Sequence, residues 1–176
     1  MRRELGLLLL VVVLHGSDDV TKVDKTSGQG VSNYENLGGR NFIDVVTDGL
    51  GMLLADSGGG IVRFTLSNNE YQLLLNEGDG LSAISAIALR MDGDETWLAV
   101  AESDAGEIWF FDYSATNYTV SDQVSAAMPI GSVDRMVVLG DYLLGGGVDT
   151  GLHVFTDLPW VEIGAGSGAA LAQGDT

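Results

Sequence analysis

Three segments of this chain, each with phenylalanine four residues after a glycine, line up at a nearly constant spacing. The copies begin at Gly60, Gly106 and Gly151, so consecutive copies are 46 and 45 residues apart. Their sequences are GIVRFT, GEIWFF and GLHVFT. A fixed period of about 20 to 50 residues indicates a repeat architecture, in which each copy is one supersecondary unit that stacks on its neighbours.

Each copy contains four short apolar segments in the same order. The first segments cover 42–46, 84–89 and 133–138, the second cover 52–55, 97–100 and 142–144, the third follow the glycines, and the fourth begin at Tyr71, Tyr118 and Trp160. Asp and Gly join the first segment to the second, and both residues tolerate the positive φ of tight hairpin turns. No segment after residue 16 shows a sustained 3.6-residue apolar period, so we expect strands and negligible helix.

Four strands in about 45 residues is the size of a β-propeller blade. The third segments are apolar on successive residues, as at 108–111 (IWFF), which is typical of a strand covered on both faces. A β-sandwich or a parallel β-helix would also use short strands and glycine turns, but neither predicts four strands at this period. The sequence therefore predicts an all-β fold of four-stranded antiparallel blades.

Residues 84–112, ISAIALRMDGDETWLAVAESDAGEIWFFD, resemble the blade pattern of WD-repeat and YVTN-type propellers. Gly80-Leu81-Ser82, followed by Ile84 and Ile87, is similar to the repeats of periplasmic sensor propellers. The resemblance covers roughly residues 42–164 and implies a β-propeller. It implies no single activity, because propellers include binding scaffolds, lactonases, dehydrogenases and sensors.

The repeat divides residues 42–176 into blades at 42–78, 82–124 and 131–164, with 166–176 as the start of a fourth. A closed propeller typically has about four to eight blades. We therefore expect a partial propeller, either the N-terminal portion of a longer protein or a chain that closes a ring with a second copy. An open stack exposes an apolar sheet face at each end, which favours self-association.

The N-terminus carries Arg2 and Arg3 before an apolar run from residue 5 to 14, and polarity returns at His15. This pattern fits a secretory signal better than a membrane span, which needs about 20 apolar residues. Residues 1–16 are therefore predicted to be a signal peptide of a secreted or periplasmic protein. The alternatives are a buried strand or a misassigned start codon. Residues 17–41 are predicted to form a polar linker with one short strand near 31–36.

The chain carries 25 Asp and Glu against 8 Lys and Arg, a formal net charge of −17. This charge would repel a phosphate backbone, so nucleic acid is not an expected partner. With no cysteine in the chain, disulfides and thiolate chemistry are excluded. The acidic residues are scattered over turns rather than concentrated in a tail, which favours solvated loops. The alternatives are cation binding and tolerance of high salt.

Several acidic residues could in principle bind a cation. Asp92, Asp94 and Glu95 place three carboxylates on one turn, where calcium could bind, but an ordinary hairpin explains them better. Asp44 and Asp134 occupy corresponding positions on first strands and could line a central channel. A serine or alanine replaces them in the second copy, so we favour a structural role in capping loops or facing channel water.

The other conspicuous residues are predicted to be structural. His153 lies in an apolar third strand and is assigned no role. The glycine-rich segments at 57–60 and 145–147 are predicted to be turns, since neither precedes a helix or a lysine as a phosphate loop would. Trp97, Trp109 and Trp160 are predicted to pack in the core rather than to bind carbohydrate.

No catalytic, cofactor-binding or metal-binding residue is assigned, and no cofactor is expected. The sequence predicts a non-catalytic extracytoplasmic scaffold that binds a protein, peptide or glycan through loops at one end of the ring. One alternative is an enzyme of the lactonase or hydrolase type with a metal in its channel. Another is a structural module of a surface layer or a sensor ectodomain.

Overall fold

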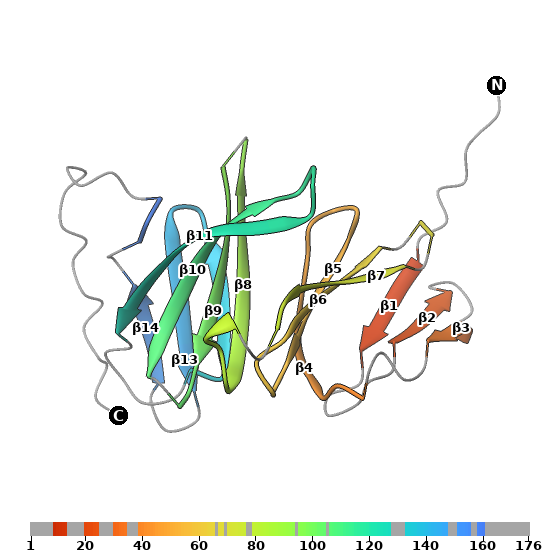
Figure 1. The fold of residues 1–176 in the computed structure, drawn as a ribbon, viewed down its shortest axis with the longest axis horizontal. Coiled ribbons are helices and arrows are strands. Elements are labelled where there is room, and N and C mark those ends of the chain that lie inside the picture. Colours follow the sequence, from red (N-terminus) through yellow and green to blue (C-terminus); the bar gives the residue numbers. More distant parts are fainter. Residues whose placement is uncertain are drawn as a thin grey trace.

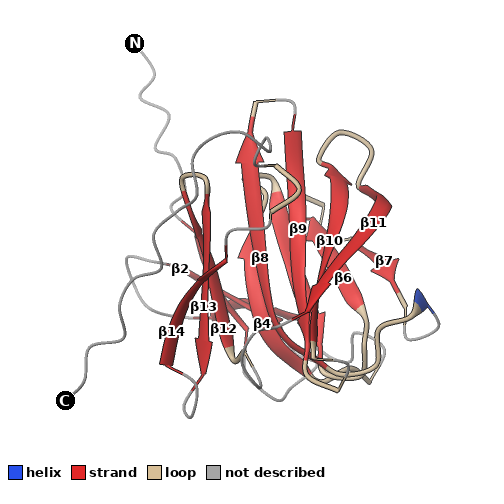
Figure 2. Ribbon diagram, turned by 90° about the vertical axis from the view of Figure 1, so that its left-hand side faces the viewer, coloured by secondary structure: helices blue, strands red, loops and turns tan. Residues whose placement is uncertain are grey.

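A computed structural model of the 176-residue chain gives the fold. The residues that it describes are 9–13, 20–24, 30–34, 39–65, 67–68, 70–76, 79–93, 95–104, 106–127, 133–147, 151–155 and 158–160. Regular structure in these ranges is β-strand, apart from a short helical turn at Asp79 (Figure 2). The described part contains no helix long and apolar enough to cross a membrane.

The strands form four antiparallel sheets, each with its strands paired in chain order. Blade 1 consists of β4 (Phe42–Thr47), β5 (Gly51–Asp56), β6 (Ile61–Thr65) and β7 (Tyr71–Leu75). Blade 2 consists of β8 (Ile84–Asp92), β9 (Glu95–Glu102), β10 (Glu107–Ser114) and β11 (Thr119–Ala127). Blade 3 consists of β12 (Arg135–Leu139), β13 (Tyr142–Gly147) and β14 (Gly151–Phe155). The N-terminal sheet consists of β1 (Leu9–Val13), β2 (Val20–Asp24) and β3 (Gly30–Tyr34).

The sheets succeed one another from the N-terminal sheet at one end to blade 3 at the other (Figure 1). This arrangement confirms the predicted all-β fold of antiparallel four-stranded sheets and is consistent with a propeller-like architecture. The fourth strand expected from Trp160 to residue 163 lies outside the described residues, except for Trp160 itself, which lies in a turn. The partial blade expected at 166–176 also lies outside them.

The N-terminal sheet contains a strand from the apolar leader. β1 pairs with β2, with Val11 opposite Lys22, and β2 pairs with β3. The structure thus contains a strand within the apolar leader, which was one of the alternatives to a signal peptide. Export remains a prediction. In place of a polar linker with one short strand, residues 17–41 contribute two strands, β2 and β3. β2 was not predicted because the segment is polar, although its residues Val20, Thr21 and Val23 are β-branched and favour strands.

A first hydrophobic cluster fills the junction between blades 1 and 2. Its buried members are Leu53, Ala55, Ile61, Leu75, Leu81, Ile84, Ile87, Leu98, Val100, Phe111 and Tyr113. A second cluster fills the junction between blades 2 and 3 and consists of Ala86, Ala88, Ala99, Ala101, Ile108, Phe110, Val133, Leu143 and Leu158. Blade 2 is therefore covered on both faces, which explains the run of successive apolar residues in β10.

The structure corrects the alignment of the phenylalanines in the repeat. Phe64 pairs with Met52, Phe155 with Leu143, and the residue of β10 in the same register is Phe111, which pairs with Leu98. Phe110, four residues after Gly106, lies on the opposite face and packs against blade 3. Counting four residues from each glycine does not reach the same register position, because the hairpins between the second and third strands differ in length. Ala55 pairs with Ile61 in blade 1, whereas Glu102 pairs with Glu107 in blade 2.

Candidate functional site

A buried ion pair lies at the junction of blades 1 and 2. Arg63 is on β6 and Asp48 follows β4, and each side chain is only 1% exposed. Arg63 Nε donates to Asp48 Oδ2 at 2.8 Å and to Tyr113 Oη of blade 2 at 3.2 Å. Tyr113 Oη in turn donates to Asp48 Oδ2 at 2.7 Å. One carboxylate oxygen thus holds together side chains from two blades.

The local sequence positions Asp48 for this role. Asp48 Oδ1 accepts hydrogen bonds from the amides of Leu50 at 2.9 Å and Gly51 at 2.6 Å, which closes the turn between β4 and β5. Burial alone would raise the pKa of Asp48, but the hydrogen bonds from Tyr113, Arg63 and these two amides outweigh it and hold the pKa below its usual 3.8. Asp48 is therefore a charged partner for Arg63.

Tyr118 extends the same junction on the side of blade 2. The guanidinium carbon of Arg63 lies 3.5 Å from the centre of the Tyr118 ring, a cation–π contact. The carbonyl oxygen of Tyr118 accepts a hydrogen bond from Gln72 Nε2 of blade 1 at 3.1 Å. Tyr118 has a positive φ of 54°, which is uncommon for a residue with a side chain. Both contacts favour this conformation of the turn before β11.

The junction of blades 2 and 3 uses the same chemistry. Arg90 on β8 donates through Nη2 to Asp92 at 2.8 Å and to Asp141 of blade 3 at 3.2 Å. Its guanidinium carbon lies 5.6 Å from the centre of the Trp160 ring. Trp160 Nε1 donates to the carbonyl oxygen of Asp141 at 3.1 Å. At both junctions, an arginine of one blade therefore meets an aromatic ring of the next.

Polar side chains also join the first strands of adjacent blades. Asp44 Oδ2 on β4 accepts a hydrogen bond from the amide of Ile87 on β8 at 3.0 Å. Ser85 Oγ on β8 donates to the carbonyl oxygen of Val133 at 2.6 Å. The structural role expected for Asp44 is thus a hydrogen bond to the next blade. Asp134 precedes β12, where its amide donates to the carbonyl oxygen of Gly146 at 2.9 Å.

Glu102, at the end of β9, is a further buried carboxylate and is 2% exposed. It accepts hydrogen bonds from the amide and hydroxyl of Ser82 at 2.8 and 2.6 Å and from Trp109 Nε1 at 3.0 Å. Burial alone would raise the pKa of Glu102, but these donors and the amide of Ala83 hold it below its usual value. Glu102 thus fixes the connection between blades 1 and 2.

The acidic turn with Asp92, Asp94 and Glu95, where calcium could bind, is only partly described. Asp92 is 71% exposed and pairs with Arg90, whereas Asp94 and the side chain of Glu95 lie outside the described residues. Across the described ranges, no three His, Asp or Glu side chains are grouped as metal ligands. His153 is half-buried on β14, opposite Gly145.

The tryptophans pack as predicted: Trp109 lies against the first hydrophobic cluster, and Trp97 and Trp160 lie against the second. The glycine-rich segment 145–147 is not a turn, however, but the end of β13. A Cβ at Gly145 would lie 2.8 Å from Phe155 Cε2 and 3.0 Å from Val133 Cγ1. Glycine is needed at position 145 because these two neighbouring side chains leave no room for a Cβ.

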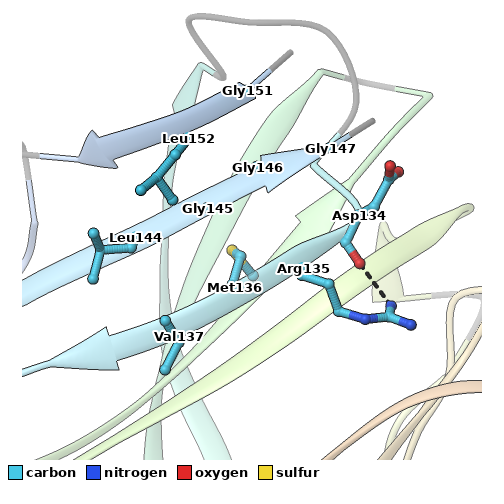
Figure 3. A pocket seen from close by; sticks show the side chains of 10 residues that line it. All are labelled: Asp134, Arg135, Met136, Val137, Leu144, Gly145, Gly146, Gly147, Gly151 and Leu152. Atoms are coloured by element: carbon cyan, nitrogen blue, oxygen red, sulfur yellow. Dashed lines mark hydrogen bonds between the residues drawn. The ribbon is translucent and has the colours of Figure 1, made fainter. Parts of the chain in front are cut away.

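Blade 3 carries an open groove of about 440 Å³ on the face that points away from blade 2 (Figure 3). Its lining residues are Asp134, Arg135, Met136, Val137, Leu144, Gly145, Gly146, Gly147, Gly151 and Leu152. Val137 and Leu152 are 58% and 71% exposed, and Leu139 and Tyr142 of the same sheet are 67% and 54% exposed. We call this apolar surface the open face of blade 3, because no sheet among the described residues packs against it.

Sequence reasoning did not identify Asp48, Arg63 or Glu102 as buried polar residues. The signal for Arg63 was a lone charge in the apolar strand IVRFT. Asp48 and Glu102 adjoin turns, where acidic residues are common, so the sequence contained no comparable signal for them. The groove of blade 3 could not be located from the sequence, because the exposure of its residues depends on which faces the blades cover.

Comparisons with known proteins agree with the fold. The sequence matches no protein-family model and no curated protein. The computationally designed Ika4 protein is similar in structure, with a TM-score of 0.58 and 13% identity over 84% of each chain. Sqt1 of Saccharomyces cerevisiae, a WD40 protein, has a TM-score of 0.59 and 12% identity over 87% of this chain and 43% of its own.

These similarities define the fold class, a propeller-like β scaffold. This chain spans less than half the length of Sqt1. At identities of 12% and 13%, the similarity concerns the fold alone. The function must therefore be argued from the residues of this chain.

Proposed function

We propose that this chain is a non-catalytic, extracytoplasmic scaffold that binds another protein through the open face of blade 3. The observation that supports it most directly is the contrast between the two faces of that sheet. Val138 and Phe155 pack against blade 2, while Val137 and Leu152 on the other face are mostly exposed. Exposed apolar surface of this kind is typical of protein interaction sites.

Four buried charged side chains at the blade junctions support a scaffold rather than a reaction site. Asp48, Arg63, Arg90 and Glu102 all take part in hydrogen bonds that fix blades or their connections. Such bonds hold the sheets at set positions and present the open face on a rigid support, which lowers the entropic cost of binding. The apolar leader at residues 5–14 supports the proposal of export, because it fits a secretory signal.

Nile red tests whether the open face accepts an apolar ligand, because this neutral dye fluoresces in apolar surroundings and is not repelled by a chain of charge −17. The dye should bind the dilute wild-type chain. Val137→Glu places a carboxylate in the groove and should reduce the emission severalfold. Val137 is 58% exposed, so this variant should fold normally.

Val124→Glu is the matched control, since Val124 on β11 is 49% exposed and lies away from blade 3's groove. It should bind the dye as the wild type does. Equal emission from wild type and Val137→Glu in dilute solution would contradict a binding role for this face.

A further inference from the structure

The open face of blade 3 extends to the hairpin between β12 and β13. Val137 pairs with Leu144, so these two side chains lie on the same face of the sheet (Figure 3). Leu139 and Tyr142 pair with each other at the hairpin. Because side chains alternate along a strand, this second pair lies on the face of Val137 and Leu144. The hairpin end of the open face is therefore apolar.

Two exposed carboxylates lie beside this hairpin end. Asp141, in the turn directly before Tyr142, has a side chain that is 78% exposed, and the side chain of Asp92 in blade 2 is 71% exposed. Both accept a hydrogen bond from the same atom, Arg90 Nη2, at 3.2 and 2.8 Å. The shared donor holds the two carboxylates close together at the junction of blades 2 and 3.

Arg90 does not neutralise the two carboxylates. Its side chain is only 8% exposed, and it gives a single nitrogen to both carboxylates instead of the two nitrogens of a bidentate pair. Its Nη1 is buried and has no hydrogen-bond partner among the described residues. One positive charge thus meets two negative charges, and the surface at the hairpin stays negative.

The chain has no other basic side chain to offer at this place. Between residues 41 and 176, the sequence contains three basic residues, which are Arg63, Arg90 and Arg135. Arg63 and Arg90 are buried at blade junctions. Arg135 is exposed at the start of β12, the end of that strand away from the hairpin. A cation that balances Asp92 and Asp141 would therefore come from another molecule.

We infer that the partner of the open face is a basic protein segment, in which a lysine or arginine adjoins apolar side chains. The inference rests on the binding role proposed above. The apolar side chains would pack on Leu139 and Tyr142, while the cationic group donates to Asp141 and Asp92 in charge-assisted hydrogen bonds. The net charge of −17 attracts the same partner from a distance and speeds the encounter.

Fluorescence anisotropy with two synthetic peptides tests the chemistry of the partner. One peptide alternates leucine with lysine, the other alternates leucine with glutamate, and both carry the same neutral dye. The full chain should bind the lysine peptide and should not measurably bind the glutamate peptide. Equal binding of both peptides, or binding of neither, overturns the inference.

The double variant Asp92→Asn, Asp141→Asn tests the position of the acidic contact. It should raise the dissociation constant of the lysine peptide about tenfold, because two charges that meet the cation are removed. Asparagine keeps an oxygen that can accept from Arg90, so the junction of the blades is retained. Asp141→Asn alone leaves Arg90 its ion pair with Asp92 and should raise the constant about threefold.

Asp79→Asn, Asp104→Asn is the matched control, because it changes the net charge by the same amount. Both residues are exposed, and since Asp79 precedes β8 and Asp104 follows β9, they lie at the end of blade 2 away from the β8–β9 hairpin. The control should leave the dissociation constant nearly unchanged. An equal loss in the two double variants would mean that the peptide responds only to the overall charge, which overturns the inference.

The apolar contact is tested without any change of charge. Leu139→Ser should raise the dissociation constant of the lysine peptide about threefold, since Leu139 is 67% exposed and would pack against the peptide. Val124→Ser, at a residue that is 49% exposed on β11, should not change it. Equal affinities for wild type and Leu139→Ser would place the basic segment elsewhere on the chain.

The Nile red assay separates failure of this inference from failure of the binding role. Dye binding that depends on Val137, together with peptide binding that does not depend on Asp92 and Asp141, keeps the binding face and rejects a basic partner. Dye emission that is equal in wild type and Val137→Glu rejects the binding role itself.

Discussion

The guanidinium carbon of Arg63 lies 3.5 Å from the centre of the Tyr118 ring, across the junction of blades 1 and 2. The same arginine donates to Asp48 in its own blade and to Tyr113 in the next. A single side chain thus links the turn after β4 to the sheet of blade 2. The stability of the junction should depend on it more than on any exposed ion pair.

Arg63→Leu should lower the free energy of unfolding by about 3–5 kcal/mol, because it leaves the buried carboxylate of Asp48 without its cationic partner. Urea unfolding at neutral pH measures the change. The double variant Arg63→Leu, Asp48→Asn should recover part of the loss, since the unpaired charge is removed. A loss under about 1 kcal/mol in the single variant would show that the pair contributes little.

The stability of the chain should fall in acid, and Asp48 should account for part of the fall. Its pKa is lower in the folded chain than its usual 3.8, so its contribution is present above that pH and is lost as the pH falls through the folded value. Asp48→Asn should flatten the acid side of a plot of unfolding free energy against pH. An unchanged slope below pH 3.8 would contradict this assignment.

Tyr113 should make the stability of the chain depend on pH in the alkaline range. Burial and the neighbouring Asp48 raise its pKa above the usual 10.0, despite the opposing effect of Arg63. Its contribution is therefore present below pH 10.0 and is lost as the pH rises toward the folded value. Tyr113→Phe should remove this alkaline dependence, measured by thermal unfolding across that range. It should also cost about 1–3 kcal/mol at neutral pH through its lost hydrogen bonds.

Gly51→Ala should destabilise the chain although Gly51 has no positive φ. Its added Cβ would lie 2.5 Å from the carbonyl oxygen of Phe64 and 2.9 Å from Arg63 Nη2. The expected loss is about 1–3 kcal/mol from overpacking. Gly58→Ala is the control, because its Cβ would have no neighbour closer than 3.7 Å. Equal melting temperatures for the two variants would argue against the close approach at Gly51.

Asp44→Ala should cost about 1–3 kcal/mol, since the amide of the buried Ile87 would lose its acceptor. Asp92→Ala, which removes a carboxylate that is 71% exposed, should cost much less. Hydrogen exchange gives a direct readout, because the amide of Ile87 should exchange faster in Asp44→Ala alone. Unchanged protection of this amide would mean that Asp44 does not stabilise the junction.

Export should remove the leader. If residues 1–16 are a signal peptide, the secreted chain begins near Ser17 and lacks strand β1 (Leu9–Val13). Mass spectrometry of the protein recovered from its native host gives the N-terminal residue. A chain that retains residues 9–13 would instead favour their role as a strand of the N-terminal sheet.

The elements of the fold could be predicted because their signals are local. Strands such as 84–89 and 97–100 are apolar and β-rich, and the Asp-Gly pair between them favours a tight turn. The repeat then indicated that the strands group in fours. The register was harder to predict, since a difference of one residue in hairpin length moved Phe110 to the opposite face from Phe64 and Phe155.

The sequence by itself determined the class of fold, because hydrophobic pattern, turn residues and repeat period all act between residues near one another in the chain. Only the tertiary structure decided which polar residues join the blades and which apolar face stays open. Asp48 and Tyr113 are 65 residues apart, and their hydrogen bond exists only because two sheets pack together. Val137 and Val138 are adjacent and alike, yet one is exposed and the other packs against blade 2, since a neighbouring sheet covers a single side of β12.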